Sequence, residues 1–278
     1  MRKLSFVRVF FDSFTLLKKC PRLYIPKILV AFFFFPIFIL LPFYLLEANI
    51  MAPTNHVTQP LQLFGVLIQL VFILVYTIVV YVVDSFIVNP MYPVLVKQYY
   101  KEKEINFHRA FSTVVRHFGT IFPALLVVSM LIFAAMLPFL FIMVTALLLK
   151  NTFLFYLAIG TAFISIFAIF VLFYLIYPIS SLEDFNFKKA LKQAIRISLK
   201  HKADIAKAFF LSMVISGVSY LLGFMIAWLN TPDQLVPKLG LFTAFVAIRV
   251  LIAVFATYQY VLNAVFYLGI EKGVFLSR

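Results

Sequence analysis

Three charged residues interrupt long apolar runs of this sequence. Glu47 stands late in the first predicted span and Asp84 late in the second, each directly after an uncharged run, and Arg249 stands within the last. A charge inside a bilayer costs roughly 2.5–3.5 kcal/mol on insertion scales, so each of these residues is a candidate functional residue. On a helix, Tyr260 and Asn263 continue the face that carries Arg249. We expect these five residues to bind a ligand or to form structural ion pairs.

Helical rise predicts which of these charges pair with each other. If the three spans are taken as about 28–49, 62–88 and 240–266, Arg249 lies about 6 Å outward of the centre of its span, Glu47 about 13 Å outward, and Asp84 about 13 Å inward. An extended arginine spans the gap of roughly 7 Å to Glu47, but hardly the roughly 19 Å to Asp84. We therefore expect Arg249 to pair with Glu47 or to snorkel toward it, which requires the first and last runs to be neighbours. For Asp84 we expect a lysine at the same end, such as Lys27, and the alternative is that Asp84 lines a cavity.

Residues for catalysis or metal binding do not form a recognisable pattern. The sequence lacks the HExxH, GxSxG, glycine-rich phosphate-loop and Cys-x-x-Cys motifs. Three histidines (His108, His117 and His201) lie among lysines and arginines, a poor setting for a metal cation. Glu183 and Asp184 are adjacent, so on a helix they do not face each other, and we expect them to supply negative charge before the next segment. We expect no catalytic residue, no metal and no cofactor, and we predict that the protein is not an enzyme.

Composition places the chain in a membrane. The 278 residues are 64% hydrophobic and 12% charged, whereas soluble domains carry about 25% charged residues. Uncharged, apolar runs longer than about 18 residues are typical of transmembrane helices. Six are present, at 28–46, 61–83, 121–149, 152–181, 208–230 and 239–270. The single cysteine, Cys20, precedes the first run; acylation is one alternative there, and an unmodified interfacial thiol is the expectation.

The distribution of lysine and arginine predicts the orientation. Twenty-one of them lie before the first run, between runs two and three, between runs four and five, and after run six, whereas the opposite loops hold only Lys150 and Lys238. The positive-inside rule then puts both termini in the cytoplasm of a multi-pass protein of the cell membrane. The net charge of +14 is spread over these juxtamembrane segments. We expect anionic lipid headgroups as partners, with a protein partner also possible, and no nucleic acid.

Three basic amphipathic segments resemble one another. Residues 106–118 match 186–198 at an offset of 80, and residues 10–19 match 107–116 at an offset of 97. Each segment places apolar or small residues at i, i+3, i+4 and i+7, with basic residues opposite. Asn106 and Asn186 suit the N-cap position of their helices. We expect the large apolar members to face the bilayer or the inner ends of the spans: Phe10, Phe14, Phe107, Phe111, Phe187 and Leu191.

Together these patterns predict an all-α integral membrane protein. Its single membrane domain, 1–278, consists of three repeats (1–96, 97–181 and 182–278), each a cytoplasmic in-plane helix followed by a transmembrane hairpin. Runs two and four end alike, in Asn89-Pro90 and Tyr177-Pro178. In the fifth run, small residues at 212, 216, 219 and 223 predict close helix packing, with a polar substrate lining as the alternative.

The segment SLEDFNFKKALKQAIRISLKHKADIAKAFFLSMVISGVSYLLG resembles a recurring segment of a family of six-helix membrane domains. These include the membrane domain joined to some glycerophosphodiester phosphodiesterases and related stand-alone bacterial and archaeal proteins of unassigned role. The shared pattern is an acidic lead-in, an Ala-Leu basic amphipathic helix and a long span. The resemblance implies a membrane-embedded, lipid-proximal module, and it carries over no catalytic residue.

Three functions remain open at this point. The leading hypothesis is a module that binds or translocates a lipid or another hydrophobic or amphipathic molecule, because aromatic-rich spans stand beside a basic collar. The second is a structural or scaffolding protein that recruits partners or shapes the bilayer through its amphipathic helices. The third is an ion channel or secondary transporter.

The predicted topology is testable by labelling. Single cysteines at Asn55 and Asp233, in a background that lacks Cys20, should react with an impermeant thiol reagent added to intact cells, because both positions lie in the outer loops. A cysteine at Ser112 should be protected until the cells are permeabilised. Labelling of Ser112 from outside would reverse the topology.

Overall fold

The chain is helical throughout the part described by a computed structural model, residues 6–33, 60–229 and 238–272. Within that part, four helical stretches are long and apolar enough to cross a membrane: Val71–Glu102, Phe118–Leu148, Thr152–Leu182 and Val246–Ile270. These stretches overlap the predicted runs two, three, four and six. The observed architecture of the described residues is therefore all-α, with four candidate membrane-spanning helices.

The helices fall into three groups. The amphipathic helices are α1 (Phe6–Lys19), α6 (Phe107–Arg116) and α10 (Phe187–Lys200). The long helices are α4 (Pro60–Val83), α7 (Phe118–Leu148), α8 (Thr152–Leu172), α11 (Lys202–Leu229) and α12 (Lys238–Lys272). The remaining elements are the 3₁₀ turn η1 (Pro21–Tyr24), α2 (Ile25–Phe33), the π-helical turn η2 (Asp84–Val88), α5 (Asn89–Glu102) and α9 (Ile176–Leu182).

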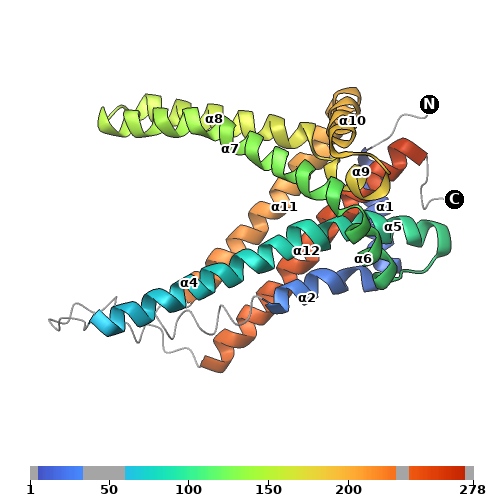
Figure 1. Ribbon diagram of the computed structural model, residues 1–278, viewed down its shortest axis with the longest axis horizontal. Coiled ribbons are helices and arrows are strands. Elements are labelled where there is room, and N and C mark those ends of the chain that lie inside the picture. The colour runs from blue at the N-terminus through green and yellow to red at the C-terminus, as the bar shows by residue number, and fades with distance from the viewer. Residues whose placement is uncertain (1–5, 34–59, 230–237, 273–278) are drawn as a thin grey trace.

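The long helices converge at one end of the molecule and diverge toward the other (Figure 1). We call the first the basic end, where α1, α5, α6, α9 and α10 lie, and the second the far end. The antiparallel pair of α7 and α8 leads away from α4 on the way to the far end (Figure 1). Along this pair, large apolar side chains are exposed, among them Phe133, Phe141 and Phe163. The packed protein core therefore belongs mainly to the basic end.

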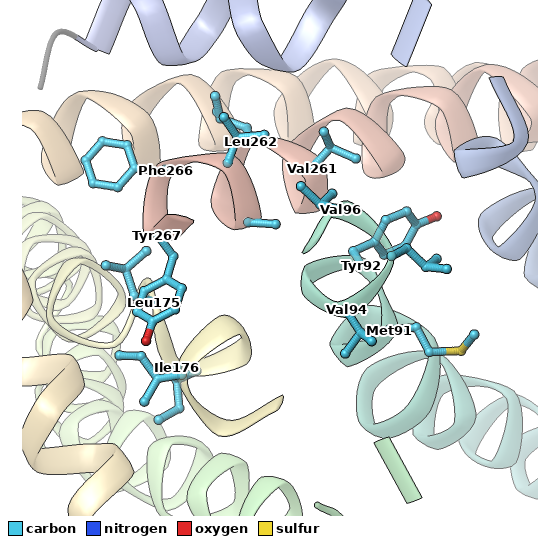
Figure 2. Packing of buried hydrophobic residues seen from close by; sticks show 14 of the residues in the cluster. Met91, Tyr92, Val94, Val96, Leu175, Ile176, Val261, Leu262, Phe266 and Tyr267 are labelled. Carbon is cyan, nitrogen blue, oxygen red and sulfur yellow. The ribbon is translucent and has the colours of Figure 1, made fainter. Parts of the chain in front are cut away.

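Three helical segments meet in this core. The contacts join α5, α9 and α12, and Figure 2 shows Tyr92 and Val96 of α5, Leu175 and Ile176 beside α9, and Phe266 of α12 around their meeting point. Every residue from Val261 to Leu268 is buried. Half of the most apolar stretch of α12 is buried, against 11% for α7. The last helix is thus the central one, and α1, α2, α5, α9 and α11 all pack against it.

The amphipathic helices form as predicted. The side-chain oxygens of Asn106 and Asn186 accept hydrogen bonds of 2.9 Å from the amides of Arg109 and Lys189, so both N-caps are confirmed. Each helix buries a matching pair of positions: Ser13 and Leu17, Ala110 and Val114, and Ala190 and Ala194.

Among the large side chains beside those buried pairs, Phe107, Phe187 and Leu191 pack against the core, whereas Phe14 and Phe111 are exposed. Phe14 is 60% exposed and Phe111 45%, while Phe10, Phe107, Phe187 and Leu191 are half-buried. The small residues therefore make the close contact with the spans, because a small side chain lets two helices approach. Phe14 and Phe111 lie on the exposed flank, where lipid would contact them.

The second and fourth predicted runs do not end at their Asn-Pro and Tyr-Pro pairs. After Asp84, the chain continues through η2 into α5, and after Leu172 it turns at 173–175 into α9. Proline has no N–H, so Pro178 leaves the carbonyl of Tyr174, four residues earlier, without its helical donor. Asn263 of α12 supplies that donor through its side-chain amide. The side chain of Asn263 on α12 therefore satisfies the carbonyl that the break in the helix leaves without a donor.

The serines of α11 also contact α12. Gln259 donates to the carbonyl of Ser212 and to the hydroxyl of Ser216 at 2.8 Å, and the hydroxyls of Ser212 and Tyr174 lie 3.4 Å apart. These contacts fit the packing role predicted for the small residues of this helix.

The link between Pro178 and Asn263 is testable with two substitutions. Asn263→Leu should lower the free energy of unfolding by roughly 1–3 kcal/mol, because the buried Tyr174 carbonyl loses its donor. Pro178→Ala restores an N–H four residues after Tyr174, so the same Asn263→Leu change should cost less in that background. Thermal unfolding in detergent measures both costs, and equal costs in the two backgrounds would contradict this explanation.

Candidate functional site

A lysine and an aspartate form an ion pair at the basic end. The ammonium of Lys27, near the start of α2, donates to both carboxylate oxygens of Asp84 at 2.7 Å. The Lys27 side chain is 6% exposed and the Asp84 side chain 19%. The pairing of Asp84 with Lys27 is thus confirmed. It joins the first segment of the chain to the end of α4.

Three tyrosines surround this pair from α5, α9 and α12. The Lys27 ammonium lies 4.6 Å from the centre of the Tyr260 ring, within the range of a cation–π interaction. Tyr92 stacks on Tyr260, with ring centres 5.8 Å apart, and Tyr177 meets it edge-on at the same distance. The Tyr92 hydroxyl lies 3.3 Å from that of Thr257. The cation therefore has one anionic partner and one aromatic partner, and the aromatic partner is itself held by two further rings.

The π-helical turn η2 presents Asp84 to the pair. Its backbone is closed by the amide of Asn89, which donates to the carbonyl of Asp84 five residues earlier. Pro90 and Pro93 follow directly and carry no donor, which disfavours regular α-helical bonding across this stretch. Single π turns inside helices are frequent at functional sites. This local irregularity is a second reason, besides the buried charge, to regard Asp84 as the centre of the site.

The predicted site residues do not all come together. Asp84 and Tyr260 lie at the ion pair, and Asn263 lies about one turn farther along α12, at the Tyr174 carbonyl. Arg249 lies eleven residues before Tyr260, or about 17 Å along the helix. Since Lys27 occupies both oxygens of Asp84, the expected separation of Arg249 from Asp84 holds.

Glu47 lies outside the described residues, so its pairing with Arg249 stays a prediction. In the described part, the start of the first run, α2, packs against α12. That the first and last spans are neighbours along their length stays a prediction.

Sequence reasoning missed Tyr92 and Tyr177 and did not count Lys27 as a site residue. The available signal was the similar pair of Asn89-Pro90 and Tyr177-Pro178, which marks the two places where a helix is interrupted beside α12. Ring contacts between distant segments cannot be read from spacing along the chain. They depend on how α5, α9 and α12 meet.

The acidic pair before α10 takes two separate partners. The Tyr267 hydroxyl donates to Glu183 at 3.0 Å, and Nε2 of His117 lies 3.0 Å from Asp184. The two carboxylates thus bind different helices, as expected for residues that do not act together. Within the described residues, no group of three histidine, cysteine, aspartate or glutamate side chains is arranged to hold a metal ion.

Cys20 precedes α2 and is buried. Burial raises the pKa of its thiol, which disfavours the thiolate form that reacts with modifying groups. The unmodified thiol is the reading that this environment favours.

Comparison with known proteins finds no match to this chain among protein-family models, curated proteins or solved structures. The likeness to the membrane domains joined to some glycerophosphodiester phosphodiesterases therefore rests on residues of the sequence alone. The contacts at the basic end are the evidence from which function is argued.

The ion pair is testable by a double-mutant cycle. Lys27→Met and Asp84→Leu should each destabilise the protein by roughly 3–5 kcal/mol, because each leaves one charge without its partner in a desolvated site. The double variant should recover much of that loss, since it leaves no lone charge. Thermal unfolding in detergent reports the three values. Additive losses would mean that the two side chains are not coupled.

Proposed function

We propose that this protein is a six-span protein of the cell membrane that binds an amphipathic, lipid-like molecule and holds or translocates it. The carrying observation is the shape of the helical core. The long helices pack together at the basic end and separate toward the far end (Figure 1). The Lys27–Asp84 pair, with its cluster of tyrosines, lies at the basic end. Such an arrangement offers apolar surface for chains and polar groups for a head.

Three repeats, each an in-plane helix followed by a hairpin, account best for the contacts of the short helices. Within this scheme, α6 packs against α5, α10 against α9, and α1 against α12. The short helices of the second and third units therefore each contact the second span of the preceding unit. The short helix of the first unit, α1, contacts the second span of the third unit, so the three units form a closed ring. The Tyr258 hydroxyl donates to the carbonyl of Phe10 at 3.3 Å, which supports this closure. The matching buried pairs of the three helices support the same repeat.

The basic end suits the cytoplasmic face of the membrane. Exposed aromatic side chains on α1, such as Phe11 and Phe14, lie on the same short helix as Lys18 and Lys19, which are exposed too. An in-plane helix of this kind inserts its apolar side among acyl chains and holds its basic residues at anionic headgroups. Anionic lipids of the inner leaflet are accordingly the general partners that we propose for this surface.

Lipid-proximal function also agrees with what the family resemblance implies. Scaffolding through the amphipathic helices would need the same basic collar, but it gives no role to a buried ion pair in a tyrosine cluster. The pair is therefore the feature on which the test is built.

Native mass spectrometry of the purified protein, followed by lipid extraction, tests the proposal. The wild-type protein should retain one adduct of lipid mass after gentle activation. The variant Lys27→Met/Asp84→Leu should lose this adduct, because it keeps apolar volume but removes the polar head site. The matched control, Glu102→Gln/Arg109→Gln, removes an exposed ion pair of 2.8 Å and should keep the adduct.

Two outcomes would contradict the proposed function. A wild-type protein free of lipid under every gentle condition would favour a scaffolding role instead. An adduct retained equally by both double variants would show that the lipid does not use the Lys27–Asp84 site.

A further inference from the structure

The Lys27 ammonium is held in the way that proteins hold a bound cation. It makes two hydrogen bonds of 2.7 Å to Asp84 and lies over the face of Tyr260 at 4.6 Å. A carboxylate joined by an aromatic face is a recurring arrangement for binding ammonium groups. The cluster is thus chemically an ammonium site, and a side chain of the same protein occupies it.

The Asp84 side chain is more exposed than the Lys27 side chain. Lys27 is the inner member, at 6% exposed, and Asp84 is the outer member, at 19%. A ligand that approaches from outside therefore meets the carboxylate before it meets the ammonium. An anionic head would be repelled by Asp84 and would find Lys27 covered, whereas a cationic head would be attracted.

The occupant is attached by a flexible stem. Lysine carries its ammonium on four methylene groups with several rotatable bonds, and Lys27 lies in the first turn of α2, directly after the 3₁₀ turn η1. Withdrawal of this side chain would leave Asp84 and Tyr260 in place, because Tyr260 is held by Tyr92 and Tyr177, and Asp84 by the turn η2.

We propose that Asp84 and Tyr260 form a binding site for the primary ammonium group of an amphiphile, and that Lys27 is a tethered occupant that this group replaces. The inference rests on the proposed function and deepens it by naming the head group. The two hydrogen bonds to Asp84 require N–H donors, so the site selects a primary ammonium over a quaternary one. The ammonium comes from either of two sources, a lipid headgroup or a soluble amine.

Chemical rescue tests the site directly. Lys27→Ala removes three carbons and the ammonium, and propylammonium supplies the same atoms. Propylammonium chloride should raise the melting temperature of the Lys27→Ala protein in a saturable way. At ten times its dissociation constant it should increase the apparent folding equilibrium constant about elevenfold. Propanol, sodium propionate and sodium chloride at equal concentration should not.

The controls separate site binding from general effects of the amine. Wild-type protein should respond much less than Lys27→Ala, because Lys27 competes with propylammonium for the site, and Lys27→Ala/Asp84→Asn should not respond, because the carboxylate is gone. If Lys27→Ala cannot be purified alone, the yield of folded protein with and without propylammonium becomes the readout. The absence of rescue, or equal rescue by propanol, would overturn the inference.

A second arm distinguishes the two sources. Wild-type protein is reconstituted in vesicles of phosphatidylethanolamine or phosphatidylcholine with matched chains, and bound lipid is counted by native mass spectrometry. Preference for phosphatidylethanolamine that is lost in Asp84→Asn identifies the lipid headgroup, whereas rescue of Lys27→Ala without such preference identifies a soluble amine. A lipid adduct that persists while propylammonium fails to rescue Lys27→Ala would leave the proposed function standing and refute this site.

Discussion

A charged pair in apolar surroundings is stable only while each member holds the other, and this condition organises the basic end of the molecule. Lys27 and Asp84 come from segments 57 residues apart, and Tyr260 of the last helix covers the cation. Loss of one charge leaves the other desolvated and unpaired, which is far more costly than the pair itself. The helix α2, the end of α4 and the helix α12 are thereby required to meet at one point.

Missing backbone donors impose the second constraint. Pro90 and Pro178 interrupt two long helices at comparable places, and the interruptions are resolved differently. In one, the chain forms a π turn whose first residue is Asp84, and in the other, Asn263 donates to the freed carbonyl of Tyr174. Both solutions involve α12, whose Tyr260 and Asn263 are about one turn apart. From its central position, α12 thus contacts the buried Lys27 ammonium through Tyr260 and donates a hydrogen bond to the Tyr174 carbonyl through Asn263.

Much of this arrangement was predictable from the sequence, and the reason lies in local periodicity. Apolar length predicts the long helices, and Asn106 and Asn186 predict two helix starts, because capping depends only on neighbours in the chain. The pairing of Asp84 with Lys27 was predictable because both residues lie at the same end of the predicted spans. The tyrosine cluster did not, because Tyr92 and Tyr177 contact Tyr260 only through the packing of α5 and α9 on α12. The sequence did not predict the π turn at Asp84 or the break at 173–175, where two helices are interrupted without ending.

The ionised Lys27–Asp84 pair is the central claim, and infrared spectroscopy of aspartate labelled with carbon-13 tests it most directly. The difference between wild-type protein and Asp84→Asn at neutral pH isolates the vibrations of this one side chain. The account predicts the bands of an ionised carboxylate in the wild-type protein. The carbonyl stretch of a protonated acid at this position would contradict an ion pair.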